Sequence, residues 1–415
     1  MTQIAASPRP APGLVESREI AQGRAIPAYL TRLRLGVALL MLTVAALTVA
    51  QLFLGRAAAN RAAADAEQVA RIQTIKVDLL RADALATNAF LTGGLEATAQ
   101  RTAYDQAIGA ASATIAAASS AQSLDRDALA ELNALLVRYA AGMEVARANN
   151  RLGLPVGAAY LRAASADLRG RGMVLTDALL TANTVRARSS LADQHPVWVA
   201  LPGLLALGGL YAANRWIATR FRRRINVGIA VAGGLTLLLT LGAVAVSSAQ
   251  ALENTRLQDG SYGALLRVAQ ARSSANAAKS SESLRLIARG SGKSFEEAWA
   301  TQSKDVSGLI PDTLRDPWTA YTKAHAALVA KDDAGDWDGA VALATSTAAG
   351  AATPAFQEFD TQLAAELDGD RASVDSALNS GNWVPVLVAV LAGLAGLGAT
   401  WASWRGVSRR LEEYV

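Results

Sequence analysis

The chain has 415 residues, of which 52% are hydrophobic and 18% are charged, and it contains no cysteine. This composition excludes a disordered or fibrous chain, and the lack of cysteine excludes a disulfide scaffold, thiolate metal sites and a cysteine nucleophile. The two histidines, His195 and His325, provide little material for a histidine-rich metal centre or a Ser-His-Asp triad. The net charge of +5 conceals a segregation of charge along the chain.

Four long stretches carry no charged residue, and they lie at 35–54, 196–214, 225–252 and 376–404. Each supplies about 20 residues in helical conformation, which is enough to cross a hydrocarbon core of roughly 30 Å. We therefore predict four transmembrane helices. Their centres lack Asp, Glu, Lys and Arg, which argues against a transporter or channel that acts alone.

The first stretch could also be read as a signal peptide cleaved near Ala57, Ala58 and Ala59. However, 34 residues precede its apolar core, and that core is long for a signal sequence. A retained transmembrane helix is the preferred interpretation.

The flanking charges orient the predicted helices. The segment before the first helix, the link between the second and third, and the C-terminal tail together hold 13 basic and 4 acidic residues. The two large segments between helices hold the remaining 27 basic and 31 acidic residues. Because positive loops stay in the cytoplasm, both termini and the link are predicted to be cytoplasmic, and both large segments to lie outside.

The first large segment predicts helices, because it is rich in alanine and its apolar residues recur at steps of three and four. Four such stripes indicate a four-helix bundle whose outer helices continue into the membrane. The stripes are Ile72, Ile75, Leu79, Ala82, Ala86; Tyr104, Ile108, Ala111, Ile115, Ala118; Leu129, Leu132, Leu136, Tyr139, Met143; and Leu161, Ala164, Leu168, Leu175, Leu179. Breaks are expected near Gly93, Ser119–Asp125 and Gly153–Pro155.

The second large segment is also predicted to be helical. Ser294–Glu297 fits a capping box, and Thr353-Pro354 fits an N-cap followed by proline. Trp318, Tyr321, His325 and Leu328 share one helix face. The helix at 273–286 has a weak apolar stripe and many polar residues, so we expect it to be solvated, with contact to a partner as the alternative.

No phosphate-binding loop or dinucleotide fingerprint occurs, and no paired carboxylates can be located. Asp332, Asp333, Asp336 and Asp338 resemble part of a calcium loop, but the closing glutamate is missing, so a solvated turn is expected. His325 is expected to be a packed core residue and His195 an interfacial one. We thus predict no catalytic, cofactor or metal site.

Together these features predict an all-α membrane protein with four transmembrane helices and two extracytoplasmic helical bundles in tandem. The repeated order of span, large segment and span indicates a duplication. The predicted boundaries are 1–34 for the cytoplasmic N-terminal segment, 35–55 for the first transmembrane helix, 56–194 for the first extracytoplasmic bundle, 195–217 for the second transmembrane helix, 218–225 for the Arg-rich link, 226–248 for the third transmembrane helix, 249–382 for the second extracytoplasmic domain, 383–404 for the fourth transmembrane helix and 405–415 for the cytoplasmic tail.

The order of span, bundle and span resembles the four-helix-bundle sensor domain of methyl-accepting chemotaxis receptors and sensor kinases. The matching features are a helix that continues from the first span and the Phe-Leu-Thr-Gly-Gly ending at 90–94. Those receptors carry a cytoplasmic relay module after a span. Here the link is about 10 residues and about 11 follow Trp404, which is too short for an enzyme or a signalling coil.

The doubled arrangement of four spans is similar to the actinobacterial GlnX-type membrane proteins, by architecture and composition over nearly the whole chain. That resemblance implies a role in amino-acid sensing, with a glutamine/glutamate-type solute-binding lipoprotein outside and a soluble Ser/Thr kinase, protein kinase G, inside. It transfers no individual site residue.

The leading functional prediction is a non-enzymatic transmembrane sensor subunit, multi-pass in the cell membrane, with no nucleic-acid partner and with homo-oligomerisation left open. The alternative is a structural or assembly protein of the cell envelope, and a transporter accessory subunit is a third class. Four link arginines form a candidate docking point for a cytosolic partner or anionic lipid, although anchoring alone also explains them. They are Arg220, Arg222, Arg223 and Arg224.

Overall fold

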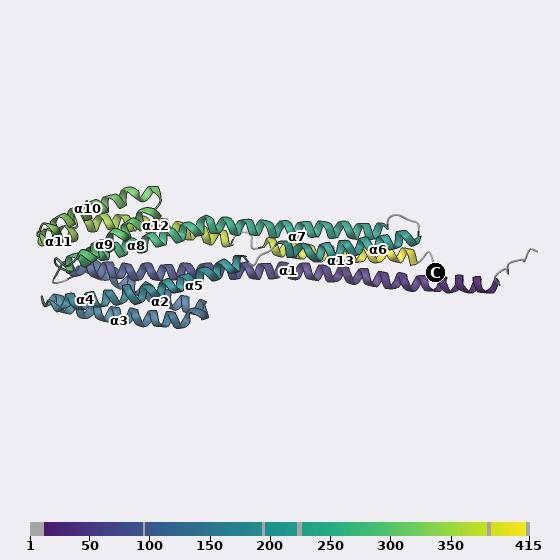
Figure 1. The fold of residues 1–415 in the computed structure, drawn as a ribbon, viewed down its shortest axis with the longest axis horizontal. Coiled ribbons are helices and arrows are strands. Elements are labelled where there is room, and N and C mark those ends of the chain that lie inside the picture. The colour runs from purple at the N-terminus through teal and green to yellow at the C-terminus, as the bar shows by residue number, and fades with distance from the viewer. Residues whose placement is uncertain (1–11, 94–95, 193–195, 222–225, 380–382, 412–415) are drawn as a thin grey trace, which may run out of the picture. The chain divides into compact units, whose positions relative to one another are not determined.

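The computed structural model describes residues 12–93, 96–192, 196–221, 226–379 and 383–411, and these residues form helices and short connections without any strand. This confirms the all-α prediction for the described residues (Figure 1). The α-helices are α1 Pro12–Leu91, α2 Thr98–Ala121, α3 Arg126–Arg151, α4 Val156–Asp167, α5 Met173–Ala192, α6 Pro196–Phe221, α7 Val227–Asp259, α8 Ser261–Ile287, α9 Lys293–Leu309, α10 Arg315–Asp333, α11 Trp337–Thr345, α12 Ala352–Asn379 and α13 Val384–Leu411. Two 3₁₀ turns, Ser123–Asp125 and Asp312–Leu314, precede α3 and α10, and a π-helical turn, Leu168–Gly172, joins α4 to α5.

The chain divides into two compact units. One, here called the span unit, comprises Met1–Ala59, Ala192–Glu253 and Gly381–Val415. The other, here called the bundle unit, comprises Asn60–Leu191 and Asn254–Ser380. The bundle unit therefore contains most of both large segments that the sequence places between predicted spans.

The first half of the bundle unit packs α2 to α5 against the C-terminal part of α1 (Figure 1). The four predicted apolar stripes meet in one core, in which Ile72, Leu79, Leu129 and Leu132 are fully buried. Burial of these side chains is the main term that stabilises such a bundle. Ala277, Leu284 and Ile287 of α8 belong to the same core, so a helix of the second half completes the first.

The second half of the bundle unit has its own aromatic core. Trp318 and Tyr321 of α10 pack on Phe356 and Phe359 of α12, with ring centroids 4.8 Å apart for Trp318 and Phe359 and 5.2 Å apart for Tyr321 and Phe356. The predicted common face of Trp318, Tyr321, His325 and Leu328 is confirmed, because all four are buried.

Glycine ends the long helices as predicted. α1 ends at Leu91, and Gly93 adopts a φ of 63°. α8 ends at Ile287, and Gly290 adopts a φ of 83°. A residue with a Cβ atom would be strained in this left-handed conformation, which explains the glycine at both ends.

Two helix starts differ from the predictions. α9 begins at Lys293 with Gly292 as its N-cap and without a side-chain cap, so the capping box predicted at Ser294–Glu297 is wrong. Its Glu296 instead pairs with Arg285 and His325. α12 begins at Ala352, and the Thr353 hydroxyl donates to the carbonyl oxygen of Ala344 rather than capping the helix.

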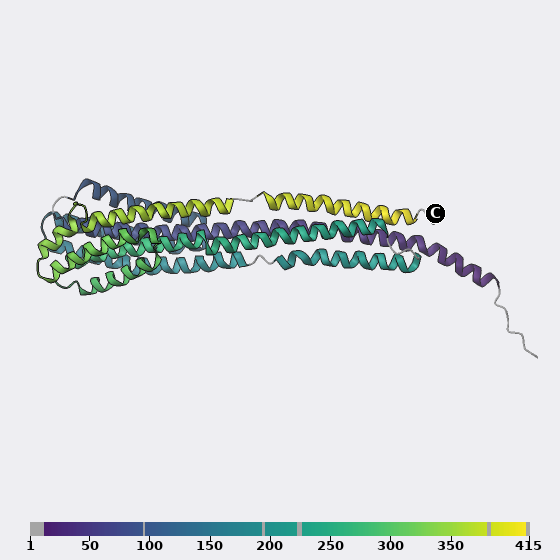
Figure 2. The ribbon, with the colours of Figure 1, turned by 90° about the horizontal axis from the view of Figure 1, so that it is seen from above.

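The span unit packs α6, α7 and α13 beside the N-terminal part of α1, and Figure 2 shows these helices from a second direction. Val37 and Met41 of α1 contact a core that includes Ala206 of α6, Ala232 of α7 and Ala399 of α13. Gly396 of α13 lies against the side chain of Ala45, and Gly228 of α7 lies against Gly406. Small residues thus let these helices approach closely, as in membrane helix pairs.

Among the described residues, three helices are long and apolar enough to cross a membrane, within Tyr29–Leu91, Val227–Ala249 and Val386–Arg409. The sequence predicted four. The exception is the second predicted span, α6, which is helical and contains Pro202 and three glycines. Three apolar helices are compatible with a multi-pass membrane protein.

Candidate functional site

A long polar helix, α8, lies inside the bundle unit. Its residues from Ser273 to Ile287 are buried, and the prediction that this helix is solvated is wrong. A helix buried on all sides is normally apolar. The buried polar residues of α8 are Ser273, Ser274, Asn276, Lys279, Ser280, Ser281, Glu282, Ser283 and Arg285.

One buried carboxylate, that of Asp83, joins α8 to the first half. Asp83 lies on α1 and is fully buried. Its Oδ2 accepts hydrogen bonds from Ser280 of α8 at 2.5 Å and from Ser165 of α4 at 2.9 Å, and its Oδ1 accepts one from the Tyr139 hydroxyl of α3 at 3.3 Å. Burial, together with the nearby Asp83, raises the pKa of Tyr139 well above its usual value, so the hydroxyl remains a donor. Four helices thus share one polar centre.

Further contacts reinforce this joint between the halves. Arg169, within the π-helical turn, donates to the Ser281 hydroxyl at 2.8 Å and to the Ala277 carbonyl at 3.3 Å. Asn88 of α1 donates to the Thr353 hydroxyl at 2.9 Å. π-helical turns are rare and often occur at functional positions. Here the turn presents Arg169 to α8.

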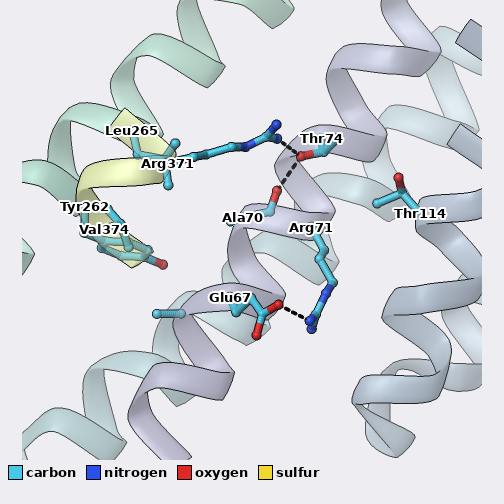
Figure 3. Close-up of a pocket in the computed structure, with 10 residues that line it drawn as sticks. Glu67, Ala70, Arg71, Thr74, Thr114, Tyr262, Leu265, Arg371 and Val374 are labelled. Atoms are coloured by element: carbon cyan, nitrogen blue, oxygen red, sulfur yellow. Dashed lines mark hydrogen bonds and ion pairs between the residues drawn. The ribbon is translucent and has the colours of Figure 1, made fainter. Parts of the chain in front are cut away.

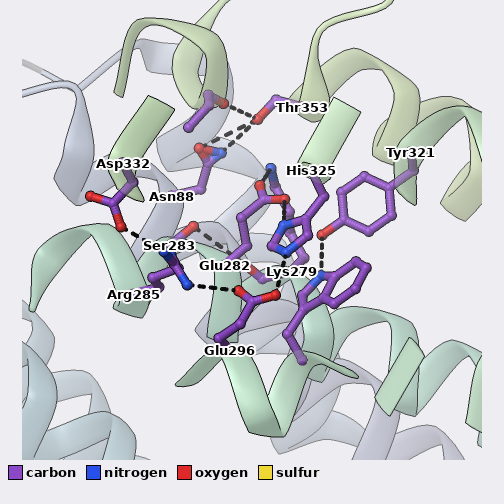
Figure 4. Close-up of polar contacts among 12 residues, drawn as sticks. Asn88, Lys279, Glu282, Ser283, Arg285, Glu296, Tyr321, His325, Asp332 and Thr353 are labelled. Atoms are coloured by element: carbon purple, nitrogen blue, oxygen red, sulfur yellow. Dashed lines mark hydrogen bonds and ion pairs between the residues drawn. The ribbon is translucent and has the colours of Figure 1, made fainter. Parts of the chain in front are cut away.

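Glu282 is the centre of a second network, shown in Figure 4. Its two carboxylate oxygens lie 2.6 Å from Lys279 Nζ and 2.8 Å from His325 Nδ1, and all three side chains are buried. Trp299 stacks on the His325 ring with centroids 3.6 Å apart. Nε2 of His325 lies 3.4 Å from Glu296. The histidine therefore has an acidic partner on each nitrogen.

The electrostatics of this network favour its charged forms. Burial by itself would raise the pKa of Glu282, but the Lys279 charge and the His325 contact lower it to about 2. Burial would lower the pKa of His325, whereas its hydrogen bonds to Glu282 and Glu296 hold it above the usual value. Both shifts follow from opposite charges held together away from water.

Three carboxylates of the acidic cluster at the end of α10 and the start of α11 have cationic partners. Arg285 Nε lies 3.0 Å from Asp332, and the guanidinium also pairs with Asp333 and with Glu296. Asp336 instead caps α11 through the Gly339 amide at 2.9 Å and pairs with Lys331. No group of three or more potential metal ligands occurs among the described residues. In the structure, Asp332 and Asp333 therefore take part in ion pairs with Arg285.

A third charged group lies where α1 meets α8 and α12. Arg272 binds Asp360 through two hydrogen bonds of 2.8 and 2.9 Å, and Asn276 adds a third at 3.3 Å. Burial opposes ionisation of Asp360, but the Arg272 contacts keep its pKa below the usual value. Asp78 differs, because burial outweighs the nearby arginines and raises its pKa to about 6.

Two cavities open among the helices of the bundle unit. One, of about 340 Å³, is bordered by Glu67, Arg71, Thr74, Tyr262 and Arg371 (Figure 3). Arg71 pairs with Glu67, and Arg371 donates to the Thr74 hydroxyl. The Tyr262 hydroxyl is buried without a hydrogen-bond partner among the described residues, and burial raises its pKa to about 12. The other cavity, of about 290 Å³, lies between α1, α2, α8 and α12.

The residues predicted to dock a cytosolic partner are only partly visible. Arg220 belongs to α6, whereas Arg222, Arg223 and Arg224 lie outside the described residues, as does His195.

The sequence analysis missed the buried ion pairs of α8, because it identified buried helix faces only from the periodic spacing of apolar residues. The spacing of Lys279, Glu282 and Arg285, each three residues apart, was the available clue. Charged side chains at this spacing can pair along one helix face. Nothing in the sequence shows that His325 and Asp360 complete these pairs, or that Asp83 binds Ser280, from distant helices.

One part of the chain is similar to a known protein family. Neither a search among curated proteins nor one among solved structures found a match to the chain. Residues 58–192 match the actinobacterial sensor domain family. These residues extend from α1 to the end of α5 and include Asp83, Tyr139 and Ser165. The first half of the bundle unit is therefore similar to a sensor domain, which supports a sensing or signalling role.

Proposed function

We propose that this chain is a non-enzymatic transmembrane sensor subunit. The observation that carries the proposal is that α1, Pro12–Leu91, contains both an apolar stretch long enough to span a membrane and the first core helix of the sensor-domain match. A displacement within the bundle unit can then travel along one uninterrupted helix. Helix shifts of about 1–2 Å are a known means of signalling.

We further propose four membrane spans, with α6 as the fourth. Its Ala206, Leu210 and Ala213 pack in the core shared with α1, α7 and α13, which supports a common environment. Charge segregation supports cytoplasmic termini and an extracytoplasmic bundle unit. A helix containing proline and glycine is tolerated in a membrane when neighbouring helices surround it.

The proposed signal is extracellular amino-acid availability, received through a solute-binding lipoprotein and relayed to a cytosolic Ser/Thr kinase. This part rests on the resemblance to GlnX-type proteins. The link arginines, Arg220 and 222–224, are the proposed cytoplasmic contact, because guanidinium groups bind carboxylates and phosphates through paired hydrogen bonds.

Topology is tested first, in the cysteine-free background of this chain. An impermeant thiol reagent applied to intact cells should label Ser120→Cys and Asp333→Cys, since both side chains are exposed or largely exposed in the structure. It should label Arg222→Cys only after the cells are opened. Equal labelling of Arg222→Cys on intact cells would overturn the orientation.

Signalling is tested by replacing Arg222 and Arg223 with Gln while Arg220 and Arg224 remain. Protein level and cysteine accessibility should be unchanged, and kinase-dependent phosphorylation after addition of extracellular amino acid should fall. An unchanged response in this variant would show that these arginines only orient the membrane helices. A response that persists when the whole chain is deleted would overturn the sensing function.

The second candidate is a structural or assembly protein of the cell envelope. The observation that favours it is the extent of ion pairing inside the bundle unit, which a rigid docking scaffold also needs. Deletion would then alter envelope integrity irrespective of extracellular amino acids.

A further inference from the structure

The cavity between α1, α2, α8 and α12 has the composition of a site for a small polar molecule. Its walls combine the cations Arg81 and Lys279 and the carboxylate of Asp360 with the amides of Asn88, Gln100 and Asn276. Phe356 supplies an apolar surface. A volume of about 290 Å³ lies near the lower limit of ligand pockets, which suits a molecule of amino-acid size.

Most polar groups of the wall are already held in place by protein partners. Lys279 pairs with Glu282, Asn276 donates to the Arg272 carbonyl at 2.9 Å, and Asn88 donates to Thr353. A wall fixed by such contacts does not need to be ordered when a ligand enters, which favours binding.

Gln100 and Arg81 keep hydrogen-bonding capacity that the described residues do not use. The Oε1 atom of Gln100 is buried and has no partner among the described residues. The nearest acidic atom to the Arg81 guanidinium in the described chain is Asp360 Oδ2, at 4.0 Å, and that carboxylate is already bound by Arg272. An unsatisfied buried acceptor is costly and rare in native proteins. A ligand that donates to Gln100 and accepts from Arg81 would satisfy both.

Of the two cations in the wall, Arg81 is the less engaged, because it lies 4.0 Å from Asp360 whereas Lys279 lies 2.6 Å from Glu282. Arg81 and Arg272 both lie within electrostatic range of Asp78 and Asp360. Lys279 and Glu282 cancel one another. Arg272 is engaged by two hydrogen bonds to Asp360, which leaves Arg81 as the wall cation available to a ligand carboxylate.

We propose that this cavity directly binds a free amino acid, with its carboxylate on Arg81 and an N–H donor on Gln100. The wall residues come from both halves of the bundle unit, so the bound molecule bridges α1 and α2 with α8 and α12. The role of this site in sensing rests on the proposed function. Binding of an amino acid in the cavity is argued from the residues of its wall.

The test uses the full chain purified into lipid nanodiscs, without any binding protein. Isothermal titration calorimetry with each standard amino acid in turn should find at least one that binds. For that amino acid, the N-trimethyl derivative, which has no N–H, and the carboxamide derivative should both bind at least about tenfold more weakly, because each removes one of the two proposed contacts.

Three variants locate the site. Arg81→Gln and Gln100→Leu should each weaken binding by about tenfold or more, with unchanged helical content by circular dichroism. Tyr262→Phe lies in the other cavity and should leave the affinity unchanged. Binding that survives both cavity variants, or that is lost only in Tyr262→Phe, would overturn the assignment.

The outcome separates this inference from the proposed function. If no amino acid binds the purified chain while the cellular response still requires it, the cavity assignment fails and sensing through a lipoprotein stands. If an amino acid binds but deletion of the chain leaves the response intact, the cavity assignment stands and the sensing function fails.

Discussion

The two halves of the bundle unit are built from different kinds of core. The first half buries aliphatic stripes, such as Leu129 and Leu132, around the C-terminal part of α1. The second half has an aromatic core of its own. It also contributes α8, in which a lysine, a glutamate, an arginine and five serines are buried. Apolar side chains can pack against different neighbours at little cost. Buried ion pairs allow one arrangement of the helices, because each buried charge without its partner is costly. The contrast suggests that the first half supplies stability and α8 supplies a specific alignment.

The largest effect is expected from a charge placed in the apolar core of the first half. Leu132→Asp puts a carboxylate without a cationic partner at a fully buried site, and it should lower the free energy of unfolding by about 4 kcal/mol or more. Denaturant unfolding followed by circular dichroism measures this. Arg126→Ala, at an exposed position of α3, is the matched control and should change stability by less than about 0.5 kcal/mol.

A nearly equal loss is expected when one partner of the α8 network is removed. Glu282→Leu leaves Lys279 and His325 buried without their shared carboxylate, and it should cost about 3–5 kcal/mol. Adding Lys279→Met to this variant should recover part of the loss. If Glu282→Leu is no worse than a surface substitution, the ionic core does not contribute to stability in the way described.

A gain in stability is expected at Asp78. Its pKa is raised to about 6 by burial, so the folded state holds the proton more tightly than the unfolded state, whose pKa is near 3.8. Stability is therefore lost as the pH rises from about 4 through 6. Asp78→Asn should remove this loss and raise the free energy of unfolding at pH 7 by about 1–3 kcal/mol. A decrease at pH 7 would show that the arginine contacts outweigh burial.

The smallest effect is a pH dependence from His325. Because its folded-state pKa is raised, its contribution is fully present below the unfolded value near 6.5 and is lost as the pH rises through the folded value. Unfolding measured between pH 6 and 9 should show this decline, and His325→Gln should reduce it. The same slope in both proteins would exclude His325 as its origin.

The sequence allowed the first half to be predicted in detail, because stripes such as Leu129, Leu132 and Leu136 repeat with the helical period. It predicted the common face of Trp318, Tyr321 and His325 for the same reason. The expectation that α8 is solvated was wrong, because a polar residue such as Ser280 is expected at the surface unless its buried partner, Asp83, is known. That pairing joins positions 197 residues apart, and no local pattern encodes it.

The second predicted span shows a related limit. Counting uncharged residues places a membrane helix at 195–217, and α6 covers most of this range. It contains Pro202 and three glycines, and it is not among the three helices of the described chain that are long and apolar enough to cross a membrane. Packing against α1, rather than composition alone, is what places α6 in the span unit.

The central claim is that both large segments form one unit joined by α1, α8 and α12. The direct test combines Asn88→Cys with Thr353→Cys, whose native side chains are hydrogen-bonded, in a chain carrying a protease site in the link at 222–225. After cross-linking with a short bifunctional thiol reagent and cleavage of the link, the two fragments should migrate together.

The control pair is Ser120→Cys with Thr353→Cys. Gln68 binds the carbonyl oxygen of Ala118, so the end of α2 lies near residue 68, about 30 Å along α1 from Asn88. This pair should not cross-link. Fragments that separate in the Asn88/Thr353 variant, or that join equally well in the control, would contradict the single unit.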